Sequence, residues 1–340
     1  MPSATACWRK SAVDCAARST RTTNWRGSAA TSSWRWEAPL DLSERQAQVS
    51  IGASIGLALY PLHATGADAL LRRADIAMYE AKQAQRRVAV YEVGHDESHL
   101  RRIGLIGDLR TARERDEFRV FYQPKIDLRS QRVAHVEALL RWQHPVLGNI
   151  APDEFIPLAE HCGLIHEITA FVLAAGLQQA SAWRDDGLEI GLAVNLSPMD
   201  LLDARLPERV AGLLQAHRFP ARELILEITE STVMRDVQSA LVTMRALRAL
   251  GVRLSIDDFG TGHSSLAQLR SLPVDEIKID KSFVMRLDSS TDDTVIVRSA
   301  IEIGHNMGLV VIAEGVEQAG SLDILQRLHC DMVQGYFFSK

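Results

Sequence analysis

The 340-residue sequence has little that would carry it into a membrane, out of the cell or onto a nucleic-acid polymer. No apolar run approaches the roughly 18 to 20 residues of a membrane-spanning helix, and no signal peptide with an apolar centre opens the chain. The formal net charge is -5, so the chain lacks the basic surplus with which proteins wrap a nucleic-acid polymer. We therefore expect a cytoplasmic protein with no membrane segment and no nucleic-acid polymer as its partner.

Cysteine is scarce as well, since only Cys7, Cys15, Cys162 and Cys330 occur. These four lack the paired spacing of zinc sites and fit free thiols in a reducing compartment. Apolar residues, by contrast, make up 46% of the chain and charged residues 24%. This composition is typical of a soluble protein with room for one large domain and a smaller one.

From about Phe118 onward, short apolar or β-branched runs alternate with stretches of helical periodicity. Eight such runs predict an α/β fold, a (β/α)8 barrel, in preference to an open sheet. The runs are FRVFYQPKI, VAHVEALLRW, IGLAVNLS, LILEITES, RLSIDD, EIKID, LVVIAEG and MVQGYFF. Gly187, Gly251 and Gly308 each separate a helical stretch from the next run, where a left-handed helix cap is the usual requirement.

Polar side chains follow most of these runs. In a parallel barrel the carboxyl ends of the strands converge on one face, which is the face where barrel active sites lie. One carboxylate at a strand end is more often a helix N-cap or a solvated charge, but that explanation would have to hold separately at every strand. The residues are Glu137, Asn195, Glu227, Asp257 with Asp258, Lys278, Glu314 and Gln334.

The carboxylates and the amide form a hard oxygen-ligand set that contains no histidine or cysteine. Such a set suits Mg²⁺ or Mn²⁺ better than zinc. Asp257 and Asp258 cannot both point along one face of a regular strand, but at a strand end each can face a different ion. Two ions roughly 3.5 to 4 Å apart are the usual arrangement for phosphodiester hydrolysis. The residues by themselves therefore predict a two-metal phosphodiesterase.

Ten segments resemble, in their order, the EAL-signature cyclic di-GMP phosphodiesterase family: YQPKIDL, EALLRW, HP, FIPLAE, VNLS, LEITES, IDDFGTGHSSL, LPVDEIKIDKSF, VIAEGVE and QGYFFS. The resemblance covers the chain from about Phe118 to its end. It implies a barrel in which one strand runs against the others, and hydrolysis of cyclic di-GMP to linear pGpG in bacterial second-messenger signalling. It also implies two Mg²⁺ or Mn²⁺ ions and a homodimer that forms through the barrel.

The resemblance further implies a role for each site residue. The ligands of the first metal would be Glu137, Asn195, Glu227 and Asp257. Asp258 would bind the second metal, with Asp257 as a bridge. Glu314 would be the general base or orient the attacking water, and Lys278 would orient that water and offset the phosphate charge. The nucleotide site would be lined by Gln123, Leu139 and Arg141. Glu317 and Gln334 would support the water and metal shell, and Glu230 would anchor the loop after Asp258.

Two residues depart from the usual family pattern: His263 stands where tyrosine is usual, and Lys281 where arginine is usual. Neither is a metal ligand, so we expect a changed loop or dimer contact and intact chemistry. Family members also continue past the position of Lys340 with a proline and a closing helix, so the barrel seam is expected to expose apolar surface. Two other functions fit the same motifs: a catalytically silent cyclic di-GMP receptor that acts through its loop and dimer surface, and a scaffold that retains only the barrel.

Residues 48–93 include SIGLALYP and RRADIAMYEAK, which resemble the end of a diguanylate cyclase domain of the GGDEF-signature family. The signature itself is absent, so we expect an incomplete α/β remnant without cyclase activity. A linker helix at 94–112 would join it to a phosphodiesterase domain at 113–340. Residues 1–47 are predicted to be a disordered or out-of-frame leader. If the codons are GC-rich, a one-base shift turns Thr22–Trp34 into text that contains the GGDEF signature, which the nucleotide sequence would test.

Overall fold

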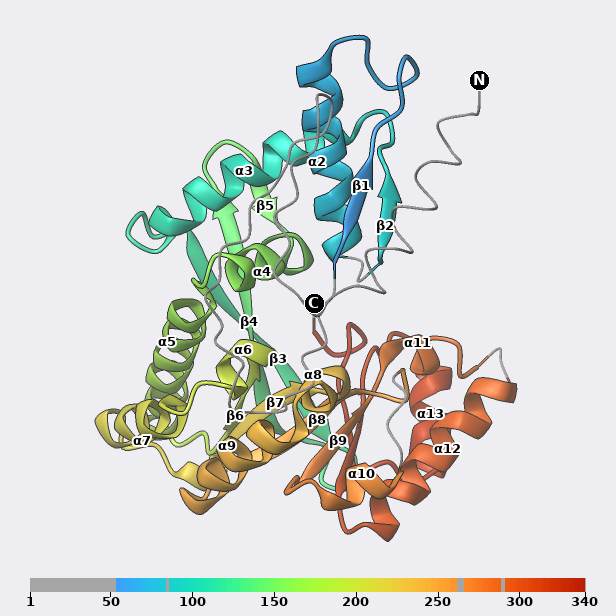
Figure 1. Cartoon of the computed structure of the whole chain (residues 1–340). Helices are drawn as coiled ribbons and strands as arrows, with labels where there is room; N and C mark the ends of the chain where they lie inside the picture. The colour runs from blue at the N-terminus through green and yellow to red at the C-terminus, as the bar shows by residue number, and fades with distance from the viewer. Residues whose placement is uncertain (1–52, 84–85, 262–265, 289–290, 340) are drawn as a thin grey trace, which may run out of the picture. The chain divides into compact units, whose positions relative to one another are not determined.

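A computed structural model describes residues 53–83, 86–261, 266–288 and 291–339 (Figure 1). The chain forms two compact units, and the boundary between them falls between Ile103 and Gly104. This boundary lies within helix α3 (His95–Ala112). The leader expected at 1–47 and the unusual His263 lie outside the described residues.

The first unit is a small α/β fragment. Strands β1 (Ile55–Leu57) and β2 (Val88–Val90) pair in parallel, and helix α2 (Ala67–Gln83) connects them. Its apolar core is small and includes Ile76 and Tyr91. Both strands keep exposed apolar side chains, so the described part of this unit buries little apolar surface.

The second unit contains a closed barrel of eight strands. Seven strands, in the order β4-β6-β7-β8-β9-β10-β11, are parallel to their neighbours, and β3 closes the ring by pairing antiparallel with both β11 and β4. The barrel strands are β3 (Phe118–Asp127), β4 (Arg132–His144), β6 (Gly191–Leu196), β7 (Leu224–Thr229), β8 (Arg253–Phe259), β9 (Glu276–Ile279), β10 (Val310–Ala313) and β11 (Met332–Val333). A further strand, β5 (Gly148–Ile150), pairs with β4. The predicted barrel with one antiparallel strand is confirmed, and each of the eight apolar runs overlaps one of its strands.

Helices follow the strands and lie outside the barrel (Figure 1). They are α4 (Pro152–His161), α5 (Ile165–Asp185), α6 (Pro198–Leu201), α7 (Leu206–Ala216), the 3-10 helix η1 (Ala221–Glu223), α8 (Glu230–Arg235), α9 (Val237–Ala249), α10 (Leu266–Ser271), α11 (Lys281–Val284), α12 (Thr291–Asn306) and α13 (Ala319–Arg327). Gly187 and Gly251 have φ angles of 86° and 87°, which confirms the left-handed caps predicted there.

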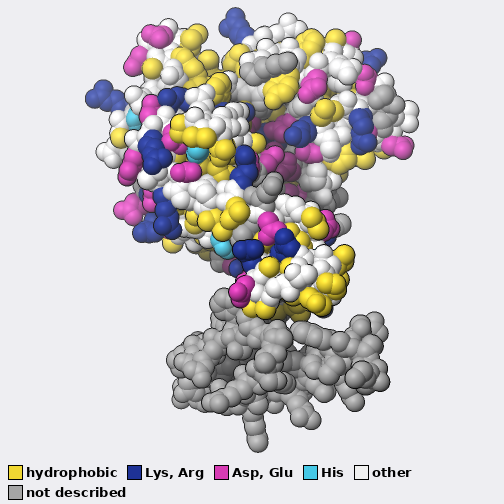
Figure 2. All heavy atoms as spheres, turned by 90° about the horizontal axis from the view of Figure 1, so that it is seen from above, with side chains coloured by type: hydrophobic (Ala, Val, Ile, Leu, Met, Phe, Trp, Pro, Cys, Tyr) yellow, Lys and Arg dark blue, Asp and Glu magenta, His cyan; other side chains and the backbone are white. Residues whose placement is uncertain are grey.

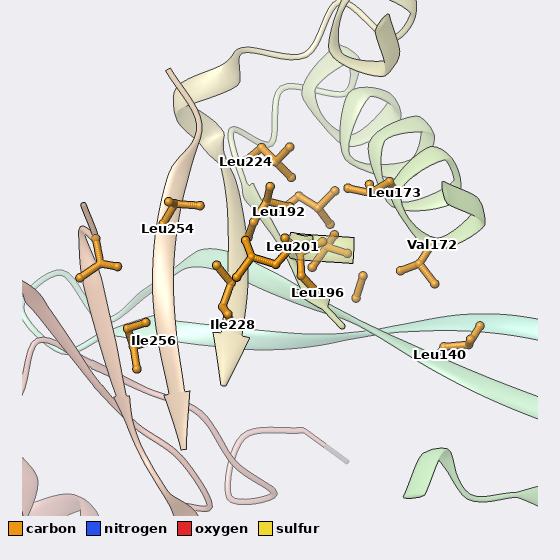
Figure 3. Packing of buried hydrophobic residues seen from close by; sticks show 14 of the residues in the cluster. Leu140, Val172, Leu173, Leu192, Leu196, Leu201, Leu224, Ile228, Leu254 and Ile256 are labelled. Carbon is orange, nitrogen blue, oxygen red and sulfur yellow. The ribbon is translucent and has the colours of Figure 1, made fainter. Parts of the chain in front are cut away.

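The main apolar core lies between the barrel wall and the helices. Leu224, Ile228 and Leu254 are fully buried, and they pack in the layer that α5 closes with Leu173 (Figure 3). Successive side chains of a strand point to opposite faces, so the residues between these leucines and isoleucines point into the barrel. This alternation carries Glu227 to the inside, where the polar residues gather.

Candidate active site

Lys278 lies at the centre of the polar cluster inside the barrel. Its Nζ is 2.8 Å from Glu227 Oε2, 3.2 Å from Asp257 Oδ2 and 3.3 Å from Glu137 Oε2, and it also pairs with Glu314. Burial alone would lower the pKa of Lys278, but the four carboxylates raise it well above its ordinary value. Lys278 is therefore a buried cation that gathers carboxylates from β4, β7, β8 and the end of β10.

Amide side chains hold Glu137 on both of its oxygens. Asn195 Nδ2 donates to Glu137 Oε1 at 2.6 Å, and Gln334 Nε2 donates to Oε2 at 2.7 Å. Gln334 also donates to Gln123 Oε1 at 2.8 Å. Burial raises the pKa of Glu137, but nearby lysines and these two donors outweigh it and lower the pKa to about 2. Glu137 is thus ionised and fixed in orientation.

Asp257 and Asp258 reach the same cavity because strand β8 is irregular at this point. The register between β8 and β9 shifts between Ile256 and Phe259, and Asp258 has a φ of 56°, in the left-handed region. Asp257 is buried and faces Lys278, whereas Asp258 is half-buried. Burial, with Asp257 next to it, raises the pKa of Asp258 to about 6. A local distortion therefore presents both carboxylates, which a regular strand would point apart.

Glu314 and Glu227 carry carboxyl groups with unusually high pKa values. Burial, together with the neighbouring carboxylates, raises the pKa of Glu314 to about 8 although Lys278 opposes the change. Burial and Glu137 likewise raise the pKa of Glu227 to about 7. A carboxyl group that titrates near neutral pH is suited to general acid or base chemistry.

These residues fit a divalent metal by their chemistry. Burial, with repulsion between the acidic residues as a further cause, raises the pKa of Glu227, Asp258 and Glu314, and a hard dication with oxygen ligands would offset that repulsion. Within the described part of the chain, no three acidic, histidine or cysteine side chains form a ready-made metal cluster. Lys278 contacts four of the acidic residues instead.

A cavity of about 500 Å³ opens beside the cluster and is lined by Asn195, Asp257 and Asp258. Leu139 and Arg141 of β4 also line it, and α4 and α5 supply an apolar wall. Gln123, the third residue predicted for the nucleotide site, is not among the residues that line this cavity. In Figure 2, acidic side chains gather in a hollow of the surface. The cavity thus combines an acidic floor, one guanidinium group and an apolar wall.

Two predicted supporting residues differ in their placement. Glu230 accepts a hydrogen bond from the backbone N–H of Gly260 at 3.2 Å, which is the contact that a loop anchor requires. Glu317 is exposed, and in the described part of the chain no hydrogen bond or ion pair joins it to the other predicted site residues. The contacts therefore support the position predicted for Glu230 and lend none to Glu317.

Sequence reasoning misses Lys125. This residue of β3 is fully buried, and its Nζ pairs with Glu227 Oε1. The signal is present in the run FRVFYQPKI, because a lysine interrupts an apolar strand two residues after the predicted site residue Gln123. An even spacing on a strand places both side chains on one face.

The closed barrel with one antiparallel strand and an acidic cluster beside a cavity defines a (β/α)8-type barrel protein. The chain belongs to the EAL domain family, which it matches over residues 106–340. Residues 29–88 match the GGDEF domain family of diguanylate cyclases. The family predicted from the motifs is confirmed for both parts of the chain.

Several relatives with known names are much longer than this chain. MucR of Pseudomonas aeruginosa, a bifunctional diguanylate cyclase/cyclic di-GMP phosphodiesterase, is 40% identical over 308 residues, which cover 90% of this chain and 45% of MucR. The signaling protein YkoW of Bacillus subtilis is 34% identical over 309 residues, which cover 90% of this chain and 38% of YkoW. The chain therefore spans less than half the length of these two relatives.

Solved structures support the same fold. The PaMucR phosphodiesterase in complex with c-di-GMP is 43% identical, with a TM-score of 0.67 over 70% of this chain and 96% of that chain. The FimX EAL domain from Pseudomonas aeruginosa, bound to c-di-GMP, is 28% identical, with a TM-score of 0.64 over 69% of this chain and 95% of that chain. Both likenesses cover most of the solved domain.

Proposed function

We propose that the chain hydrolyses cyclic di-GMP to linear pGpG with two Mg²⁺ or Mn²⁺ ions, and that it makes no cyclic di-GMP. The observation that carries this proposal is the acidic cluster around Lys278, which adjoins a cavity of about 500 Å³ that Arg141 also lines. A cavity of this volume is of the size that small ligands occupy. The likeness to PaMucR, a phosphodiesterase with c-di-GMP bound, supports the choice of substrate.

Each residue of the cluster has a distinct task in this reaction. The ligands of the first ion would be Glu137, Asn195, Glu227 and Asp257, and Asp258 would hold the second ion with Asp257 shared between them. Two bound ions supply Lewis-acid stabilisation of the phosphoryl group and a lower pKa for the attacking water.

The protein's own groups orient the substrate and move the proton. Arg141 lines the cavity with a planar guanidinium group, whose fork suits a phosphate. Lys278 places a permanent positive charge where the phosphodiester charge develops. Glu314, which Lys278 contacts, accepts the proton that the attacking water loses.

Turnover of cyclic di-GMP tests the proposal. We expect the purified chain to release pGpG with Mg²⁺ or Mn²⁺ and not with EDTA, and Glu137→Ala to lose this activity by at least 100-fold. Glu208→Ala removes an exposed carboxylate of α7 outside the site and serves as the control that keeps activity. If cyclic di-GMP binds but no pGpG is released, the chain is a silent receptor. If cyclic di-GMP neither binds nor is hydrolysed, the chain is a scaffold that retains only the barrel.

A homodimer through the barrel, which the family resemblance implies, and a cytoplasmic location, which the sequence composition leads us to expect, belong to the same proposal. Among the residues that the structure describes, no helix combines the length and apolarity needed to cross a membrane. Light scattering of the purified chain measures the mass of the assembly, and a monomer across the micromolar range would contradict the dimer.

A further inference from the structure

Lys125 lies closer than the predicted metal ligand Glu137 to the end of the barrel where the parallel strands begin, and it contacts another predicted ligand, Glu227. On the ladder between β3 and β4, Lys125 is opposite His135, whereas Gln123 is opposite Glu137. The Nζ of Lys125 pairs with Glu227 Oε1, and the other oxygen, Oε2, is 2.8 Å from Lys278. The two oxygens of Glu227 therefore face two different lysines.

Two other charged residues near Lys125, Arg253 and Glu276, form an ion pair with each other. Arg253 donates to Glu276 Oε1 at 3.1 Å through Nη1, and its Nη2 pairs with His135 Nε2. Glu276 forms its ion pair with Arg253, although burial raises the pKa of Glu276 and the charge of Lys125 also opposes that rise. Among the described residues, Glu227 is the anion with which Lys125 forms an ion pair, and both side chains are completely buried.

Burial makes this pair a fixed feature of the barrel interior. Separating this pair would leave two desolvated charges without partners, so Lys125 stays beside Oε1. Lys278 is equally buried, but it differs because it contacts carboxylates on several strands and one of them, Asp257, lines the cavity. An arriving cation can therefore replace Lys278 beside Oε2 while Lys125 keeps its contact.

We propose that Lys125 is a positioning residue for Glu227, and that it fixes Oε1 so that Oε2 alone is presented to a divalent ion. This inference rests on the proposed function, because it concerns the same site. A ligand whose orientation is already set loses less conformational freedom when it binds an ion. Partners that orient ligating side chains typically contribute 10- to 100-fold to metal affinity or activity.

Mn²⁺ binding without substrate tests the role of Lys125 separately from catalysis. Lys125→Met keeps the length of the side chain and removes its charge, while Lys125→Arg keeps a charged donor. Ser255→Ala is the matched control, since Ser255 is equally buried, lies opposite Glu227 on β8, and its Oγ has no partner among the described residues. The free Mn²⁺ signal in electron paramagnetic resonance reports the dissociation constant for each protein.

We expect Lys125→Met to raise the Mn²⁺ dissociation constant at least tenfold, with Lys125→Arg and Ser255→Ala within threefold of the wild type. At saturating metal, kcat should fall while KM for cyclic di-GMP changes less than twofold, because Lys125 does not line the cavity. Unchanged Mn²⁺ affinity in a folded Lys125→Met protein overturns the inference. Should Lys125→Met fail to fold, a tenfold loss of affinity in folded Lys125→Arg overturns it equally. A wild-type chain that binds no Mn²⁺ contradicts the proposed function itself.

Discussion

Replacing Lys278 by methionine should destabilise the metal-free protein and make its stability depend strongly on divalent metal. The substitution keeps the length of the side chain and removes its ammonium group. In the structure this group is buried, lies within 2.8 to 3.3 Å of three carboxylate oxygens and pairs with Glu314 as well. Its loss leaves several buried carboxylates without their shared cation.

The magnitude follows from the burial of the pair. Removing one partner of a buried ion pair costs about 3–5 kcal/mol, since the remaining charge stays desolvated. For a domain of roughly 150–250 residues, 1 kcal/mol corresponds to about 2–4 °C in Tm, so we expect Tm to fall by roughly 10 °C in EDTA. A dication supplies the missing positive charge, so Mn²⁺ should raise Tm more in Lys278→Met than in the wild type.

Calorimetric melting in EDTA and at increasing Mn²⁺ concentration measures both effects. Lys281→Met is the control, because Lys281 is three residues away at the start of α11 and exposed, and its Tm should stay within about 2 °C of the wild type. An unchanged Tm for Lys278→Met in EDTA, or a metal response no larger than that of the wild type, would refute the reasoning.

Three further predictions concern binding, packing and thiol chemistry. Arg141→Met should raise KM for cyclic di-GMP roughly 10- to 100-fold in steady-state assays, because it removes a charged donor from the cavity, and an unaltered KM would contradict this. Gly304→Ala should lower the free energy of unfolding by about 1–3 kcal/mol in urea titrations, because the new Cβ would lie 2.5 Å from Val311 Cγ2. Gly212→Ala should be neutral or stabilising, because a Cβ at this position would meet no atom within 4 Å. Burial raises the pKa of Cys330 to about 12, so at pH 8 its thiolate fraction is roughly 1000-fold below that of a thiol with the ordinary pKa of 9.0. Mass spectrometry should therefore find Cys330 alkylated only after the protein is unfolded.

The strands were predictable because their signal is local. Leu224 to Thr229 reads LILEIT, and such a run favours a buried strand wherever it stands in a chain. The shortest barrel strand shows the limit of this signal. The run MVQGYFF contributes only Met332–Val333 to the sheet, and a Cβ at Gly335 would lie 2.2 Å from the carbonyl oxygen of Val316. That close approach of two backbone segments has no trace in the apolar pattern.

The site was predictable in its residue types and less so in its contacts. Carboxylates that follow parallel strands must converge once the barrel closes, which is why Glu137, Glu227 and Asp257 all meet Lys278. Motif resemblance could not show that Glu317 is exposed. Nor could it show that Lys125 faces Glu227, because that contact joins residues 102 positions apart.

The sequence by itself determined which segments become strands, which family the chain belongs to and which polar residues stand at the strand ends. Tertiary structure alone decided which lysine each carboxylate faces, and how an irregularity in β8 turns Asp257 and Asp258 toward one cavity. The physical reason lies in the range of the forces involved. Alternation and capping depend on neighbours along the chain, whereas ion pairing and burial depend on distances through space that exist only after the barrel has closed.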